Sequence, residues 1–369
     1  MLRSMTYLLL LASGTTWLAP LAAGDGANVT RLESLEGRYA RNAAGEIIGV
    51  DLSNAWLTDA DLEELARLPR LERINLAYTK ITDLGLEQLK SLEHVRALNL
   101  YYAESVTDLG IAHLRHWTNL EYLNVRGTKV TSTLFEYMSK MTKLKFLDVG
   151  HSRVNDELFE NLANLDQLEH LAFGGNKMSG EALPLLKALP GLRELDVSGQ
   201  QRTDSGLWSV AVTDFNIEHI AQLERLEVLD LGQTGVSDRG LAKLARLKNL
   251  RILDLRDTKV TGKGIAALAG LPELRRLRLW QAKGIDDAAV PAFLKMQKLE
   301  VLELPETNIT AVGLEQLCAK QGLKQLYLGG VKVTPEQVEA ARKAMPDCLV
   351  SWWEKPQIEL PATRRRFGN

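Results

Sequence analysis

The sequence predicts an α/β solenoid, a curved stack of about twelve repeats and two caps, with parallel strands on the concave face and short helices on the convex face. Two observations predict this fold. An apolar–x–apolar strand signature recurs in steps of 24 or 25 residues, apart from one step of 34. A short helix pattern follows each signature. The twelve signatures begin at Val50, Ile74, Leu98, Leu123, Leu147, Leu171, Leu195, Leu229, Leu253, Leu277, Leu302 and Leu326.

One repeat is read most easily in residues 71–92, LERINLAYTKITDLGLEQLKSL. Apolar side chains alternate with a polar one at Ile74 and Leu76, which predicts a short strand with one buried face. Three leucines spaced three residues apart then follow, as on one face of a short helix. Each repeat therefore supplies one strand and one helix.

The switch from strand to helix is expected at a residue suited to capping a helix. In this repeat it is Thr82, whose side-chain oxygen can accept from free backbone N–H groups, and Asp83 suits the positive end of the helix dipole. The last repeat, Thr334–Gln337, adds a proline at the first helical position and the residues of a capping box. The same capping position is filled by Thr58, Thr107, Thr131, Asn155, Ser179, Thr213, Ser237, Thr261, Asp286 and Thr310.

A single repeat buries little apolar surface by itself. Stacking joins the leucines of neighbouring repeats into one continuous core, so Leu229 and Leu253 are expected inside it. Helices are wider than strands, and the stack must therefore curve with its strands inward.

The unit L-x-x-L-x-L-x-x-T-x-I/V-T-D-x-G-L-x-x-L resembles the leucine-rich repeat family. It is most similar to the short, helix-containing subclass that also occurs in F-box-linked proteins, and to exported bacterial leucine-rich repeat proteins. The resemblance covers about Val50 to Trp353, although the repeated cysteines of that subclass are absent. It implies a horseshoe with a recognition role and names no partner.

The sequence divides into four segments. Residues 1–24 combine a positive Arg3, an apolar stretch and small residues at 21–24, which predicts a signal peptide and export. Residues 25–47 are expected to form an N-terminal cap, and residues 48–355 the repeats with a C-terminal cap. There Trp352 and Trp353 are expected to cover leucines. Residues 356–369 are expected to form a loose tail.

Charge and cysteine content restrict the partners and the means of stabilisation. The net charge of −2 gives no electrostatic reason to expect nucleic acid or an anionic membrane as partner. After the signal peptide no stretch is apolar enough to span a bilayer. Cys318 and Cys348 are the only cysteines, and their spacing leaves open whether they pair. Apolar burial must therefore stabilise the fold.

A polar column runs between the buried apolar residues of each strand signature. Its polarity is expected to reflect an exposed concave face. A cation site is the alternative, but one carboxylate in each repeat, without clustered oxygen ligands, gives it little support. The column is Asp51, Asn75, Asn99, Asn124, Asp148, Ala172, Asp196, Asp230, Asp254, Arg278, Glu303 and Tyr327.

Two patches of aromatic and basic residues are the candidate binding sites, because such residues often dominate binding energies. Both lie at or just after outward strand positions, and single exposed aromatics would need no explanation. The N-terminal patch contains Tyr101, Tyr102, Tyr122, Arg126, Phe146, His151 and His170. The C-terminal patch contains Arg256, Arg276, Arg278, Trp280, Gln281 and Tyr327.

Three insertions fall in the same strand-to-helix loop, and insertions confined to one face often mark a binding face. The longest is centred on residues 201–211, QRTDSGLWSVA. Arg202 and Trp208 suit a recognition loop that acts together with Trp280. Because TDSGL imitates the repeat's own T-D-x-G-L, a partial duplication that bulges outward is the alternative.

Catalysis finds little support, because no nucleophile-elbow, zinc-protease, P-loop or dinucleotide motif is present. His113 and His116 share a helix face, but no third metal ligand accompanies them. No cofactor is expected. The sequence therefore predicts an exported, non-enzymatic protein that binds a protein, peptide or glycan. A ubiquitin-ligase adaptor and an envelope structural protein remain as alternatives.

Overall fold

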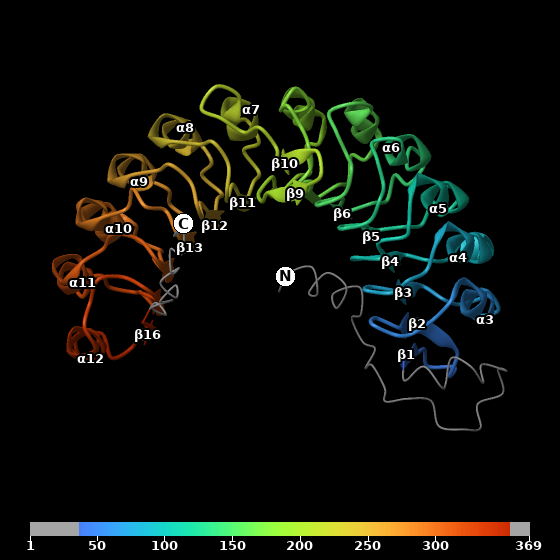
Figure 1. The fold of residues 1–369 in the computed structure, drawn as a ribbon, viewed down its shortest axis with the longest axis horizontal. Helices are drawn as coiled ribbons and strands as arrows, with labels where there is room; N and C mark the ends of the chain where they lie inside the picture. The colour runs from blue at the N-terminus through green and yellow to red at the C-terminus, as the bar shows by residue number, and fades with distance from the viewer. Residues whose placement is uncertain (1–36, 355–369) are drawn as a thin grey trace, which may run out of the picture.

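The computed structural model describes residues 37–354, which form one curved stack of strands and helices (Figure 1). One sheet of 14 strands lines the concave side, in the order β1 to β8 and then β11 to β16. All neighbouring pairs from β2 onward are parallel, whereas β1 pairs antiparallel with β2. The predicted leucine-rich repeat horseshoe is confirmed.

Strands of three residues make up most of the sheet, because each repeat supplies only one short extended segment. Equivalent positions pair across it, so that Leu229 lies between Leu195 and Leu253. The strands are β1 (Arg38–Arg41), β2 (Ile47–Asp51), β3 (Arg73–Asn75), β4 (Ala97–Asn99), β5 (Tyr122–Asn124), β6 (Phe146–Asp148), β7 (His170–Ala172), β8 (Glu194–Asp196), β11 (Val228–Asp230), β12 (Ile252–Asp254), β13 (Arg276–Arg278), β14 (Val301–Glu303), β15 (Gln325–Tyr327) and β16 (Leu349–Ser351).

Short helices cover the convex side (Figure 1). The α-helices are α3 (Leu62–Ala66), α4 (Asp83–Gln88), α5 (Asp108–His113), α6 (Leu134–Tyr137), α7 (Ile217–Ala221), α8 (Asp238–Leu244), α9 (Gly262–Leu268), α10 (Val290–Lys295), α11 (Ala311–Leu317) and α12 (Pro335–Ala344). Tighter 3₁₀ turns are η1 (Asp59–Asp61), η2 (Leu89–Ser91), η3 (Phe159–Asn164), η4 (Leu183–Ala188) and η5 (Asp287–Ala289). No helix in the described part of the chain is long and apolar enough to cross a membrane.

The core is continuous from Tyr39 to Val350, and Leu229 and Leu253 are fully buried in it, as expected. Tyr39 on β1 is buried where β1 covers the first repeat. The predicted signal peptide, the first part of the predicted cap and the predicted tail lie outside residues 37–354. At the other end Trp352 packs against the core, but Trp353 is 46% exposed and covers it less than expected.

The T-D-x-G-L segment links neighbouring repeats. Thr82 caps α4 by accepting from the N–H of Leu84, as expected. Its own N–H and hydroxyl donate to the Asp59 carboxylate of the preceding repeat, at 2.7 and 2.6 Å. A Cβ on Gly85 would lie 2.5 Å from that carboxylate. The aspartate therefore requires a glycine in the next repeat, a role the sequence analysis did not assign to either residue.

The expected helix starts are wrong in the middle of the stack, where α6 is preceded by Thr133 and α7 by Asn216 rather than by Thr131 and Thr213. No helix begins directly after Asn155 or Ser179, and only 3₁₀ turns follow, η3 and η4. Leu158 and Gly180 have positive φ values of 58° and 89°, which interrupt helical geometry at those points. The capping box at Thr334 is confirmed by its hydrogen bonds with Gln337.

Candidate binding site

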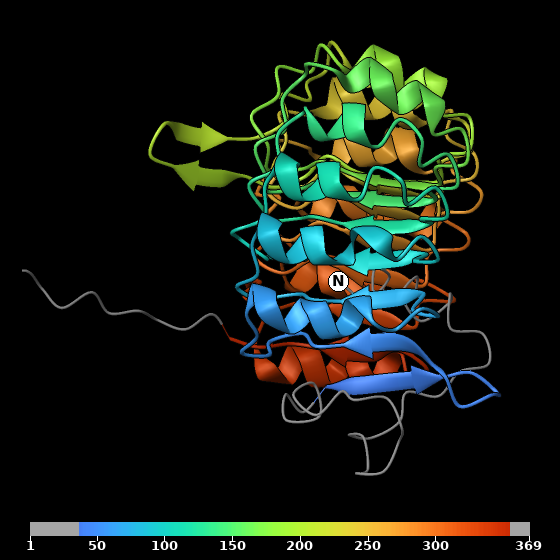
Figure 2. The same cartoon turned by 90° about the vertical axis from the view of Figure 1, so that its right-hand side faces the viewer.

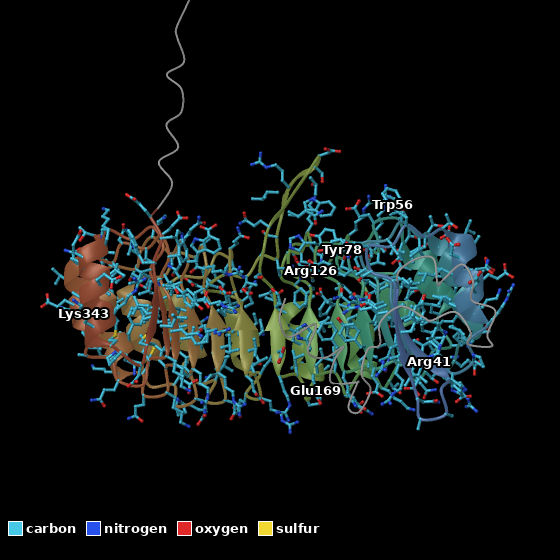
Figure 3. The ribbon with its side chains drawn as sticks, turned by 90° about the horizontal axis from the view of Figure 1, so that it is seen from below. Arg41, Trp56, Tyr78, Arg126, Glu169 and Lys343 are labelled. Atoms are coloured by element: carbon cyan, nitrogen blue, oxygen red, sulfur yellow. The ribbon has the colours of Figure 1, made fainter. Side chains whose placement is uncertain are left out.

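The horseshoe has two lateral edges with different chemistry. The strand-to-helix edge is formed by the C-terminal ends of the strands and the loops that follow them. The helix-to-strand edge lies opposite. Trp56, Tyr78 and Arg126 lie toward the first edge, together with a projecting hairpin, and Glu169 lies toward the second (Figure 3).

Each repeat turns at the strand-to-helix edge through a residue with positive φ, an arrangement that favours glycine. Non-glycine residues with branched or aromatic side chains are costly there and concentrate at functional sites. The occupants are Asn54, Tyr78, Tyr102, Gly127, His151, Gly175, Gly199, Gln233, Asp257, Gln281, Glu306 and Gly330. Tyrosine, histidine and glutamine at this turn therefore mark the edge as a candidate site.

The polar column of the strands has a structural role. In eight repeats its side-chain oxygen accepts the N–H two residues later, as when Asp148 accepts from Gly150 at 2.9 Å. Asp51, Asn75, Asn124 and Asp254 are buried, so an exposed face does not explain their polarity. The expectation was wrong because these side chains close the turn at the end of each strand.

Arginines from both predicted patches lie over the acidic part of this column. Arg126 is 3.4 Å from Asp148 and 3.5 Å from Asp196, whereas Arg256 is 3.0 Å from Asp230 and 2.7 Å from Asp254. The four carboxylates outnumber the two arginines. Burial of Asp230, and then the negative charges of Asp196 and Asp254, raise the pKa of Asp230 to about 7. The floor of the concave face is thus acidic between β8 and β12.

A cleft of about 390 Å³ opens where these arginines approach the strand-to-helix edge. Arg126 and His151 line it from one side, and Arg256, Trp280 and Gln281 from the other. The cleft joins residues that the sequence analysis placed in two separate patches. It brings together five of the residues that were proposed to contact a ligand.

Glycines make room for this cleft. A Cβ on Gly150 would lie 2.5 Å from Arg126 Nη1, and one on Gly175 would lie 2.7 Å from the His151 ring. Backbone therefore replaces side chains in repeats that lie between those of Arg126 and Arg256. Burial, followed by the charge of Arg126, lowers the pKa of His151, which favours a neutral imidazole at the rim.

Other predicted residues lie outside the cleft. Arg278 pairs with Asp254 and Glu303 on the concave face, and Arg276 lies 4.0 Å from Glu303. Tyr327 is half-buried beside Gln325. None of these three lines the cleft.

Tyr122 and Phe146 were expected at the surface, and this expectation was wrong. Each is only 1% exposed, and their rings stack with centroids 4.3 Å apart. His170 continues the stack on Phe146 at 4.0 Å. Parallel strands at about 4.8 Å spacing place successive rings face to face, so these aromatics cover one another.

Tyr101 and Tyr102 form a different cluster together with Tyr78. Their centroids lie 4.8 to 5.8 Å apart, and Tyr78 is 50% exposed. Burial, and then a hydrogen bond with Tyr78, raises the pKa of Tyr101 to about 12. Trp56 of the preceding repeat is 86% exposed, and Lys80 lies 5.4 Å from its ring. Tyr78 was not predicted as a site residue, although it occupies the same repeat position as Tyr102.

The insertion forms a β-hairpin of β9 (Gln201–Thr203) and β10 (Gly206–Trp208), which projects from the stack (Figure 2). It starts no helix, so TDSGL does not behave as a repeat here. Arg202 is exposed, and Trp208 is half-exposed and donates to Ser205. At the root, Gln200 donates to the Gln233 carbonyl at the cleft, 3.2 Å away. Neither Arg202 nor Trp208 lines the cleft.

The helix-to-strand edge is charged but self-paired. Residues just before the strands alternate in sign through most of the stack: Glu72, Arg96, Glu121, Lys145, Glu169, Arg193, Glu227, Arg251, Arg275, Glu300 and Lys324. Glu227 pairs with Arg193 at 2.6 Å and Arg251 at 3.2 Å, and Glu300 pairs with Arg275 and Lys324. A hollow of about 370 Å³ on this edge is lined by polar and charged side chains alone.

Metal binding has no support in the described residues, where no group of three or more histidine, cysteine or acidic side chains could hold an ion. Cys318 and Cys348 are free thiols.

This architecture is similar to that of known leucine-rich repeat proteins. The family model for leucine-rich repeats matches residues 225–245 and 246–269. The fold is similar to an internalin from Listeria monocytogenes, with a TM-score of 0.57 and 19% identity over 96% of this chain and 95% of that one. It is also similar to a leucine-rich repeat protein from Leptospira interrogans, with a TM-score of 0.51 and 18% identity over 78% and 74% of the two chains. No curated protein sequence matches significantly.

Proposed function

The chain is a leucine-rich repeat protein, and from that premise we propose that it is an exported, non-enzymatic protein that binds a protein or peptide through its strand-to-helix edge. The cleft at the root of the hairpin carries this proposal. It gathers two arginines, a histidine and a tryptophan from repeats that are far apart in the sequence. Residues of these types often dominate binding energies at interfaces.

Several features support the choice of edge. Trp280 is 45% exposed, and the projecting hairpin carries a second exposed apolar residue, Leu207. The opposite edge presents ion pairs that already satisfy one another. Export rests on the signal-peptide pattern of residues 1–24, which lie outside the described residues.

Capture of partners from secreted and envelope fractions tests the proposal. The immobilised chain is compared with a variant lacking residues 201–211 and with Glu227→Gln, a matched change on the opposite edge. We expect a partner captured by the wild type and by Glu227→Gln, and depleted by the deletion. Equal capture of the same proteins by all three would place the site elsewhere.

A further inference from the structure

The loops of the strand-to-helix edge carry a regular row of exposed cations. In each case the cation comes one residue after a buried side chain, such as Thr128 or Ser152. Six cations of this row have no carboxylate partner among the described residues: Lys80, Lys129, Arg153, Lys177, Lys259 and Lys332. Lys283 also belongs to the row but lies 3.7 Å from Glu306.

The unbroken part of the row leads to the hairpin. Lys129, Arg153 and Lys177 occupy three consecutive repeats, and Arg202 on β9 stands exposed in the next. Glu104 interrupts the row before Lys129. Glu157 is the exposed carboxylate nearest in sequence to Arg153, and the two make no ion pair.

The backbone is fixed at two neighbouring positions of this row. The N–H of Lys129 donates to the Val106 carbonyl and that of Arg153 to the Val130 carbonyl, each at 2.9 Å. Neighbouring repeats are about 4.8 Å apart at the strands and about 8–10 Å apart at the helices, and these loops lie between the two. An extended peptide repeats its same-side side chains every ~6.6 Å, within that interval.

We propose that this row binds an extended acidic polypeptide segment whose alternate residues are Asp or Glu, with one carboxylate facing each of Lys129, Arg153 and Lys177. The inference rests on the proposed function and names the chemistry of the partner. The net charge of −2 means that attraction of an acidic chain must come from this local row. The neighbouring cleft would receive side chains that continue from the same segment.

A peptide titration tests the proposal with the full mature chain. The probes are two labelled peptides of equal composition, one alternating Glu with Ser and one with all its glutamates in a single block. We expect the alternating peptide to bind at least about fivefold more tightly, with an affinity that falls as salt rises. Equal affinity for both peptides would contradict a match between the spacing of the peptide carboxylates and that of the cations in the row, and would overturn the proposal.

Variants separate the row from general charge. Lys129→Gln, Arg153→Gln and Lys177→Gln together should weaken binding of the alternating peptide roughly tenfold or more. The matched control changes Lys140, Lys187 and Lys248 to Gln, three exposed lysines without carboxylate partners among the described residues. Both triple variants keep the basic run Arg364–Arg366. An equal loss in both would reduce the effect to net charge and overturn the proposal.

Competition identifies the polymer class. Heparin and single-stranded DNA are compared with unlabelled peptide as competitors, at equal concentrations of negative charge. If either polymer displaces the labelled peptide more effectively than unlabelled peptide does, the row prefers another polyanion and the inference is overturned. Melting temperatures of both triple variants should equal that of the wild type, because the substituted side chains are exposed. If partner capture still depends on the hairpin when the peptide experiments fail, only this inference falls and the proposed function stands.

Discussion

The two lateral edges of the horseshoe both carry charged side chains and use them in opposite ways. On the helix-to-strand edge, acids and bases alternate through most of the stack, so Glu227 bridges Arg193 and Arg251. On the strand-to-helix edge, Lys129, Arg153 and Lys177 follow one another without intervening acids at the same position. Aromatic side chains and the hairpin also gather on the strand-to-helix edge (Figure 3).

This difference separates charges that hold repeats together from charges left available to a partner. An ion pair formed across repeats satisfies both groups and leaves little electrostatic potential for a ligand. Cations without a carboxylate partner keep an electrostatic potential that can attract a ligand. The presence of charge alone therefore does not identify a binding edge in a solenoid, whereas the pairing between neighbouring repeats does.

Both edges are supported by the same hydrophobic core, so a substitution in that core should have the largest effect on stability. Leu253→Ala should lower the free energy of unfolding by roughly 2–5 kcal/mol, because Leu253 is fully buried between two repeats. Hydrogen exchange should show protection lost also in the repeats of Leu229 and Leu277, since each repeat supports its neighbours. Unchanged protection there would contradict a continuous core.

Aromatic truncation on the binding edge should reduce binding and leave stability intact. Trp280→Ala should weaken capture of the native partner by about 2 kcal/mol, with Trp208→Ala adding to the loss. Phe215→Ala, at an 87% exposed aromatic outside the cleft, is the control. A fall in melting temperature on changing Trp208 would assign it a structural role instead. Full binding by the double variant would move the site toward Tyr101 and Tyr102.

The paired edge should show the reverse behaviour. Glu227→Gln should lower the free energy of unfolding by roughly 1 kcal/mol, because two half-exposed arginines lose a common partner. Partner capture should not change. A loss of capture equal to that of Trp280→Ala, measured on folded protein, would remove the distinction between the edges.

Acid should act in opposite directions at the paired edge and beneath the cleft. Burial acts to raise the pKa of Glu121, but hydrogen bonds from Arg96 and Lys145 outweigh it and lower the pKa, so Glu121 stabilises the fold above its unfolded pKa and loses that contribution as pH falls. The pKa of Asp230 is raised to about 7, so its stabilising contribution is present in acid and lost as pH rises through about 7.

Melting temperatures from about pH 5 to about pH 8 check the raised pKa of Asp230, because Glu121 keeps its contribution throughout this range. We expect Glu121→Gln to destabilise at both values. Asp230→Asn should match the wild type near the acid end and exceed it by a few degrees near the alkaline end. A constant difference for Asp230→Asn across the range would contradict the raised pKa.

Local sequence patterns were sufficient to predict the architecture. The alternation around Ile74 placed a strand there, the leucine spacing placed α4, and Thr82 marked the boundary between them. These features depend on side chains within one repeat, whose conformational preferences act over a few residues. The order of the repeats and their shared core followed from the 24-residue period alone.

Contacts between repeats decided the rest, because residues one or more repeats apart meet only after stacking. Arg126 and Arg256 share a cleft only because the glycines between their repeats leave it open. Tyr122 and Phe146 became buried because neighbouring strands bring their rings within stacking distance. The sequence by itself determined which residues each repeat presents. The tertiary structure decided which of them cover or neutralise one another and which remain available to a partner.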